Sequence, residues 1–84
     1  MKKQWFLLVY DIREDKRLRR LHRLIKKEGI ALQRSVFLIH ANQSQLRKIT
    51  AIVKKQTATL VDDVRLYPLR NPNILWMGDL KINL

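Results

Sequence analysis

Apolar residues recur along the chain with two different periods, which predicts both strands and helices. Residues 4–10 (QWFLLVY) are almost continuously apolar and rich in β-forming side chains, which is typical of a central strand covered on both faces, or on one face and by a partner. In residues 16–28 the apolar side chains instead recur at intervals of three and four, so they form one stripe of a helix. Residues 44–56 repeat this spacing and predict a second helix.

Polar residues and one glycine mark the expected ends of these helices. Asp15 is placed to cap the first helix, and acidic Glu14 lies beside its positive end. Gly29 stands where a glycine commonly ends a helix. Ser44 is the expected cap of the second helix.

The remaining apolar segments predict further strands. Residues 30–41 are rich in β-formers on both sides of the polar triplet 33–35, which indicates either a tight hairpin or a sharp kink between two strands. Residues 60–67 end in an alternation of apolar and polar side chains and predict another strand. Pro68 and Pro72 then frame a turn or linker.

The predicted order is therefore βαββαβ, followed by one apolar tail. This order is typical of an α+β, ferredoxin-like domain, which we assign to residues 1–70, with an antiparallel sheet and two helices on one face. Residues 71–84 are too apolar to remain unpacked, and we expect them to add a C-terminal strand on the edge of a dimer partner. The open face of the sheet also needs cover, so we expect a sheet-to-sheet homodimer.

The length and composition favour the same oligomeric state. A chain of 84 residues has a thin core, and small cores are usually supported by disulfides, a metal or oligomerisation. The absence of cysteine excludes disulfides and thiolate metal sites, and two histidines are too few for a structural zinc site. No segment approaches the ~20 apolar residues of a membrane span, so we expect a cytoplasmic protein with no membrane partner.

Positive charge is the strongest compositional feature. Eighteen Lys and Arg against seven Asp and Glu give a net charge of +11, and such a charge usually reflects a polyanionic partner. Nucleic acid is the first candidate, and an anionic membrane surface is the alternative because the first helix is basic and amphipathic. On nucleic acid, the basic face of this helix would contact phosphates without reading bases. The candidate nucleic-acid-binding residues are Arg13, Lys16, Arg17, Arg19, Arg20, Arg23, Lys26, Lys27 and Arg34.

Three short motifs add a family resemblance. The first strand ends in residues 9–12 (VYDI), residues 33–37 (QRSVF) follow the first helix, and residues 64–69 (VRLYPL) end the last predicted strand. Their order and spacing resemble the CRISPR-associated Cas-two family over residues 1 to about 70. The resemblance implies a homodimer that joins dimers of a Cas-one-type integrase and supports a short double-stranded DNA before its insertion into a CRISPR array of a prokaryotic cell.

Asp11 is the candidate catalytic and metal-binding residue. In some members of the family that the chain resembles, a divalent-metal-dependent nuclease activity is ascribed to the aspartate of the Tyr-Asp motif, which is Asp11 here. Two Asp11 side chains meeting across a dimer axis would hold one Mg²⁺ or Mn²⁺ ion, with water as the remaining ligands. The alternative is that Asp11 caps the strand-to-helix turn through backbone N–H groups.

Two functions therefore remain open. One is a DNA-binding structural subunit of spacer acquisition. The other is a metal-dependent endonuclease, acting on DNA or, in the manner of VapD-like toxin ribonucleases, on RNA. We assign no role to His22 or His40.

Overall fold

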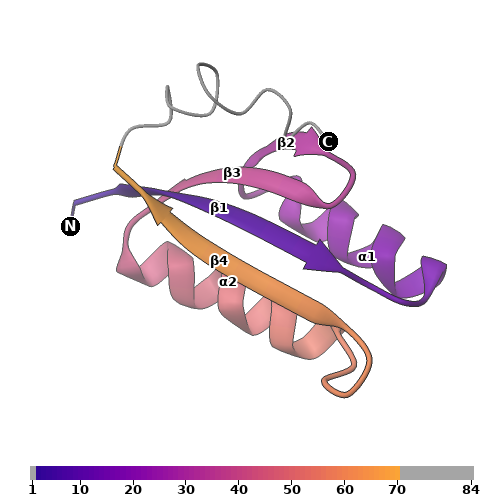
Figure 1. The fold of residues 1–84 in the computed structure, drawn as a ribbon. Coiled ribbons are helices and arrows are strands. Elements are labelled where there is room, and N and C mark those ends of the chain that lie inside the picture. Colours follow the sequence, from indigo (N-terminus) through magenta and orange to yellow (C-terminus); the bar gives the residue numbers. More distant parts are fainter. Residues whose placement is uncertain (1, 71–84) are drawn as a thin grey trace.

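A four-stranded antiparallel sheet carries two helices on one of its faces (Figure 1). The computed structural model describes residues 2–70. The strand order is β2-β3-β1-β4, and all neighbouring strands run antiparallel. This arrangement confirms the predicted α+β, ferredoxin-like order. The elements are β1 (Gln4–Asp11), α1 (Asp15–Ile25), β2 (Ile30–Gln33), β3 (Val36–Ala41), α2 (Gln43–Gln56) and β4 (Asp63–Leu69).

The central strand β1 contributes apolar side chains to both faces of the sheet. Leu8 and Tyr10 belong to the core beneath the helices, where Leu8 is paired in register with the fully buried Phe37 of β3. Because side chains alternate along a strand, Leu7 and Val9 point to the opposite face. The continuous apolar run of β1 thus supplies both faces of the sheet: the two helices cover one face, and no helix of residues 2–70 covers the other.

The polar triplet 33–35 lies in a hairpin, not in a kink between separate strands, and its first residue, Gln33, ends β2. β2 pairs directly with β3, and Arg34 and Ser35 form the turn between them. The register shifts between Ala31 and Gln33, so one irregularity lies just before the turn.

Both predicted helix caps were wrong by one or two residues. Asp15 is the first residue of α1 itself, and Glu14 before it is the cap residue, although its side chain makes no capping hydrogen bond. Ser44 already lies in the first turn of α2, so its hydroxyl cannot cap that helix. Asn42 caps α2 instead: its side chain accepts from the Gln45 amide at 2.8 Å, and the Gln45 side chain accepts from the Asn42 amide at 2.9 Å.

Gly29 serves close packing and does not mark the end of the helix. α1 ends at Ile25, and a turn separates it from Gly29, whose amide donates to the Ile25 carbonyl at 3.1 Å. A Cβ atom at Gly29 would stand 2.9 Å from the Leu38 carbonyl oxygen and 3.0 Å from Cγ1 of Ile39. The missing side chain therefore lets this turn approach the backbone of β3.

The last strand begins and ends later than predicted. β4 covers Asp63–Leu69, whereas Leu60 lies in the preceding turn and is 98% exposed. Pro68 lies within β4, in register with Phe6, and does not begin a turn. β4 is an edge strand of the sheet formed by residues 2–70, where a residue without an N–H group is tolerated. The predicted turn at Pro72 and the predicted strand in 71–84 lie outside the described residues.

Replacing Gly29 by alanine is expected to destabilise the fold by about 1–3 kcal/mol, because the added methyl group would overpack against the β3 backbone. Chemical denaturation followed by circular dichroism measures this effect. The exposed Lys27→Ala, in the same turn, should stay within about 0.5 kcal/mol of wild type. Equal stability of Gly29→Ala and wild type would contradict the close-approach role.

Candidate nucleic-acid interface and the Asp11 strand end

Six cations of α1 and of the turn that follows it share one exposed face. At about 100° per residue they span roughly a third of the helix circumference, opposite the buried Leu21 and Ile25. All six side chains are exposed to solvent. We call this surface the α1 cationic face; it consists of Lys16, Arg19, Arg20, Arg23, Lys26 and Lys27.

Arg17 lies apart from this face. Its Nε donates to Oδ2 of Asp62 at 2.9 Å, and its Nη2 donates to Oδ1 of the same carboxylate at 3.1 Å. Its Nη1 also lies 3.4 Å from the carboxylate of Glu14. A two-pronged bond of this kind holds the guanidinium in one orientation. Arg17 is therefore engaged with carboxylates of its own chain.

Asp62 joins the loop after β1 to the loop before β4. Besides Arg17, its carboxylate accepts from the backbone N–H of Arg13 at 2.9 Å and from that of Ala58 at 2.8 Å. The Asp62 side chain is fully shielded from solvent. The Arg17 guanidinium and the two N–H groups hold the pKa of Asp62 well below its usual range. No sequence pattern distinguished Asp62 from its neighbour Asp63, because the contacts that matter come from residues far away in the chain.

The Arg34 backbone is anchored to the side of α1. Its carbonyl accepts from the Tyr10 hydroxyl at 3.1 Å and bonds Nδ1 of His22 at 2.8 Å, which makes Nδ1 the donor. His22 also packs against Phe37, with the ring centroids 5.1 Å apart. Burial raises the pKa of Tyr10 to about 12. The exposed Arg34 side chain therefore extends from a turn fixed against α1.

Asp11 lies at the end of β1 and is exposed. It is paired in register with Asp63 of β4, whose carboxylate is bonded by Arg65 at 3.1 Å. Within residues 2–70, no side-chain hydrogen bond or ion pair involves Asp11. The prediction that Asp11 caps the following turn was wrong, because the Arg13 amide of that turn bonds Asp62. By strand alternation Asp11 faces away from the helices, with Leu7.

The described part of the chain holds no group of three or more His, Cys, Asp or Glu residues that could bind a metal ion. A single chain thus offers Asp11 as an isolated carboxylate, and hard cations require several oxygen ligands. In the same residues, no helix is long and apolar enough to cross a membrane.

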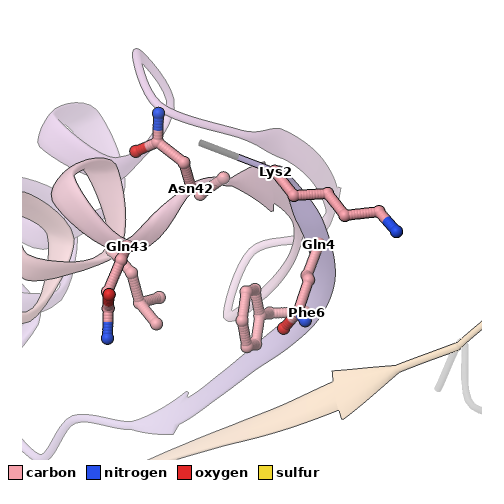
Figure 2. A pocket seen from close by; sticks show the side chains of 7 residues that line it. Lys2, Gln4, Phe6, Asn42 and Gln43 are labelled. Atoms are coloured by element: carbon pink, nitrogen blue, oxygen red, sulfur yellow. The ribbon is translucent and has the colours of Figure 1, made fainter.

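A hollow of about 390 Å³ lies at the other end of β1 (Figure 2). Gln4 and Phe6 line it from β1, and Asn42 and Gln43 line it from the start of α2. Figure 2 shows that the ammonium group of Lys2 extends away from the other labelled side chains. The amide N–H of Gln45 near this hollow is bonded by the Asn42 cap. This hollow is separate from Asp11, at the far end of the strand.

Comparison with known proteins identifies the family. The family model described as CRISPR associated protein Cas2 matches residues 4–75. The chain belongs to the Cas2 family. A relative named CRISPR-associated endoribonuclease Cas2 2, from Thermodesulfovibrio yellowstonii, is 36% identical over 77 residues, covering 88% of this chain and 85% of the relative. Another, named CRISPR-associated endoribonuclease Cas2 1, from Nitrosomonas europaea, is 41% identical over 69 residues, covering 76% of this chain and 61% of the relative.

A solved structure supports the fold of this Cas2-family chain. The crystal structure of Streptococcus pyogenes Cas2 at pH 6.5 superposes with a TM-score of 0.76 at 24% sequence identity, covering 89% of this chain and 95% of the other. At this identity the likeness concerns the fold, which is the ferredoxin-like arrangement predicted from the sequence. The family resemblance predicted from residues 9–12, 33–37 and 64–69 is confirmed by the family match.

Asp62→Asn is expected to lower the melting temperature at pH 7. It should also make the melting temperature change less between neutral and acidic pH. Because the pKa of Asp62 is lowered in the folded state, its contribution is complete above the unfolded pKa of about 4 and is lost as the pH falls below it. Thermal melts between pH 7 and pH 2 measure both effects. The difference in melting temperature between wild type and variant should become smaller toward pH 2.

The matched control is Asp63→Asn, at the exposed neighbouring carboxylate. It should retain the acid dependence of wild type. If Asp62→Asn and wild type lost stability in parallel on acidification, the interaction of Asp62 with Arg17 would not be the source of the acid dependence.

Proposed function

We propose that this protein is the dimeric, duplex-binding structural subunit of CRISPR spacer acquisition, which joins dimers of a Cas-one-type integrase. The observation that carries the proposal is the α1 cationic face. Its six cations are exposed, and within residues 2–70 the ion pairs involve other basic residues, namely Arg17, Lys48 and Arg65. Unpaired cations at this density favour contact with a phosphate backbone, which carries no sequence information.

The position of Arg34 supports the same surface. Its carbonyl is bonded to His22 of α1, so its side chain starts from a fixed point beside that helix. Arg13 lies in the loop held by Asp62, directly before α1. Because the backbone of both residues is already held in place, mainly their side chains lose conformational entropy when they bind phosphates. Arg13 and Arg34 therefore join the α1 cationic face in the proposed interface.

The open face of the sheet supports the proposed homodimer. Trp5, Leu7 and Val9 of β1 point to this face. Leu7 is buried, whereas the edges of the face carry two large exposed apolar side chains, Ile30 at 56% and Tyr67 at 44% exposure. Apolar surface of this kind marks an interaction site. A second copy packed face to face would cover it, and this packing agrees with the dimer that the family resemblance implies.

A metal-dependent endonuclease is the second candidate function. Asp11 lies on the same open face, so a second copy packed there would bring a second Asp11 carboxylate toward the first. Two carboxylates and water would suit Mg²⁺ or Mn²⁺, which activates water for phosphodiester hydrolysis when bound. Relatives named endoribonucleases favour RNA as the substrate. The hypothesis of a VapD-like toxin ribonuclease is tested by the same measurement of RNA cleavage.

Removing two charges from the α1 cationic face is expected to reduce the salt dependence of duplex binding. Each phosphate contact contributes about −0.9 to the slope of log affinity against log salt, so Arg20→Gln with Arg23→Gln should make the slope shallower by about 1.8. Fluorescence anisotropy with a labelled duplex, at several salt concentrations, measures this slope. Lys2→Gln with Lys3→Gln removes the same charge at the chain start and serves as control.

An affinity that does not change with salt in the wild-type protein would reject the proposed duplex binding. Equal slopes for the α1 variant and the control would place the interface elsewhere. Circular dichroism of each variant ensures that the fold is retained.

Asp11→Ala distinguishes the two candidate functions. If the protein is a nuclease, cleavage of single-stranded RNA or duplex DNA should require Mg²⁺ or Mn²⁺, stop with EDTA and fall at least a hundredfold in the variant, because metal-assisted hydrolysis loses its ligand. Labelled substrates on denaturing gels measure cleavage, and duplex affinity is measured in the same samples. The control Asp15→Ala removes an exposed carboxylate of the first turn of α1. Cleavage that persists in both EDTA and Asp11→Ala would rule out the nuclease.

A further inference from the structure

The second helix forms the other half of the layer that covers the sheet. α1 and α2 contact each other and lie on the same side of the sheet (Figure 1). Leu21 and Ile25 of α1 share one buried cluster with Ile49 of α2. The solvent-facing sides of α1 and α2 therefore lie on the same side of the sheet.

α2 places four cations on its solvent-facing side and has no acidic residue within its fourteen positions. Ile49 is buried and Ile52 and Val53 pack against the core, which fixes the direction of the helix. At about 100° per residue, the four cations span roughly 120° of the opposite side. These exposed residues, here called the α2 cationic face, are Arg47, Lys48, Lys54 and Lys55.

An ion pair shows that this face borders α1. Nζ of Lys48 lies 3.2 Å from the carboxylate of Glu28, in the turn after α1. Lys55 follows Lys48 by seven residues, close to two helical turns, and so lies on the same side of α2. Lys48 and Lys55 thus lie on the side of α2 next to the turn that follows α1.

We infer that a nucleic-acid duplex contacts both helices, and that the α2 cationic face binds a second row of phosphates. This inference rests on the proposed duplex binding and specifies its surface. Packed helix axes are about 8–10 Å apart, and the major groove of B-DNA is about 12 Å wide. Long lysine and arginine side chains on the two helices can therefore reach phosphates on opposite sides of one groove. In length, α1 and α2 extend about 16 Å and 21 Å, and each strand of a duplex carries one phosphate per about 3.4 Å of the duplex axis.

The chemistry of α2 favours phosphates over an acidic protein surface. Protein interfaces are usually anchored by aromatic or other large apolar side chains at their centre. The exposed residues of α2 are the four cations together with Gln43, Ser44, Thr50 and Ala51. The four cations of α2 stand among small or polar side chains, without a large apolar side chain to anchor a protein partner. This surface suits the charged phosphates of a nucleic-acid backbone.

The test removes two charges from the C-terminal end of α2. Lys54→Gln with Lys55→Gln should make the salt slope of duplex binding shallower by about 1.8, if each lysine contacts one phosphate. Between 50 mM and 200 mM salt, the affinity of this variant should therefore fall about tenfold less than that of wild type. Arg47→Gln with Lys54→Gln is a second variant of the same face, in case the first weakens the last turn of the helix.

The controls separate this inference from the proposed function. Lys2→Gln with Lys3→Gln should keep the wild-type slope, whereas Arg20→Gln with Arg23→Gln reports the α1 cationic face. If the α1 variant changes the salt slope and both folded α2 variants keep the wild-type slope, the assignment of α2 is overturned while duplex binding stands. The assignment is overturned in this case even if the α2 variants lose binding to an acidic protein. If wild type shows no salt dependence, the proposed function itself fails.

Discussion

The central strand β1 is the constraint on which the other elements depend. It pairs with β3 on one side and β4 on the other, and its alternate side chains enter two different apolar surfaces. Leu8 and Tyr10 hold the helices through the buried core, while Leu7 and Val9 form the centre of the open face. Because the register of β1 assigns every side chain to one face, a shift by one residue would exchange the two surfaces. The same register places Asp11 on the open face, away from the helix layer.

The local use of carboxylates determines which cations stay free. A chain with a charge of +11 has few acidic side chains, and most of those described are close to a specific base. Asp62 and Glu14 engage Arg17, Glu28 engages Lys48, and Asp63 engages Arg65. Most of these pairs lie at element ends and in loops, whereas Lys48 lies within α2, and none involves a residue of the α1 cationic face. Such a charge distribution attracts a polyanion at long range and is screened by salt.

The two faces of the sheet therefore suit two different partners. The helix layer carries cations and few carboxylates, which fits a phosphate backbone. The opposite face carries apolar side chains and the Asp11 end of β1, which fits a second copy of the chain. Asp62 fixes the loop between β1 and α1 to the loop before β4. Under the proposed function, this division would let one small domain dimerise and hold nucleic acid on separate surfaces.

The sequence alone determined the element order, the cationic face of α1 and the family, because periodicity and short motifs depend on residues close together in the chain. Tertiary structure decided the rest. Arg17 looks like every other cation of its helix until Asp62, 45 residues later, is folded against it. Gly29 has the position of a helix-ending glycine, yet the β3 backbone is what requires it to lack a side chain. The pairing of β2 with β3 decided between hairpin and kink. Each of these outcomes depends on contacts between distant segments, which no local pattern of residues can encode.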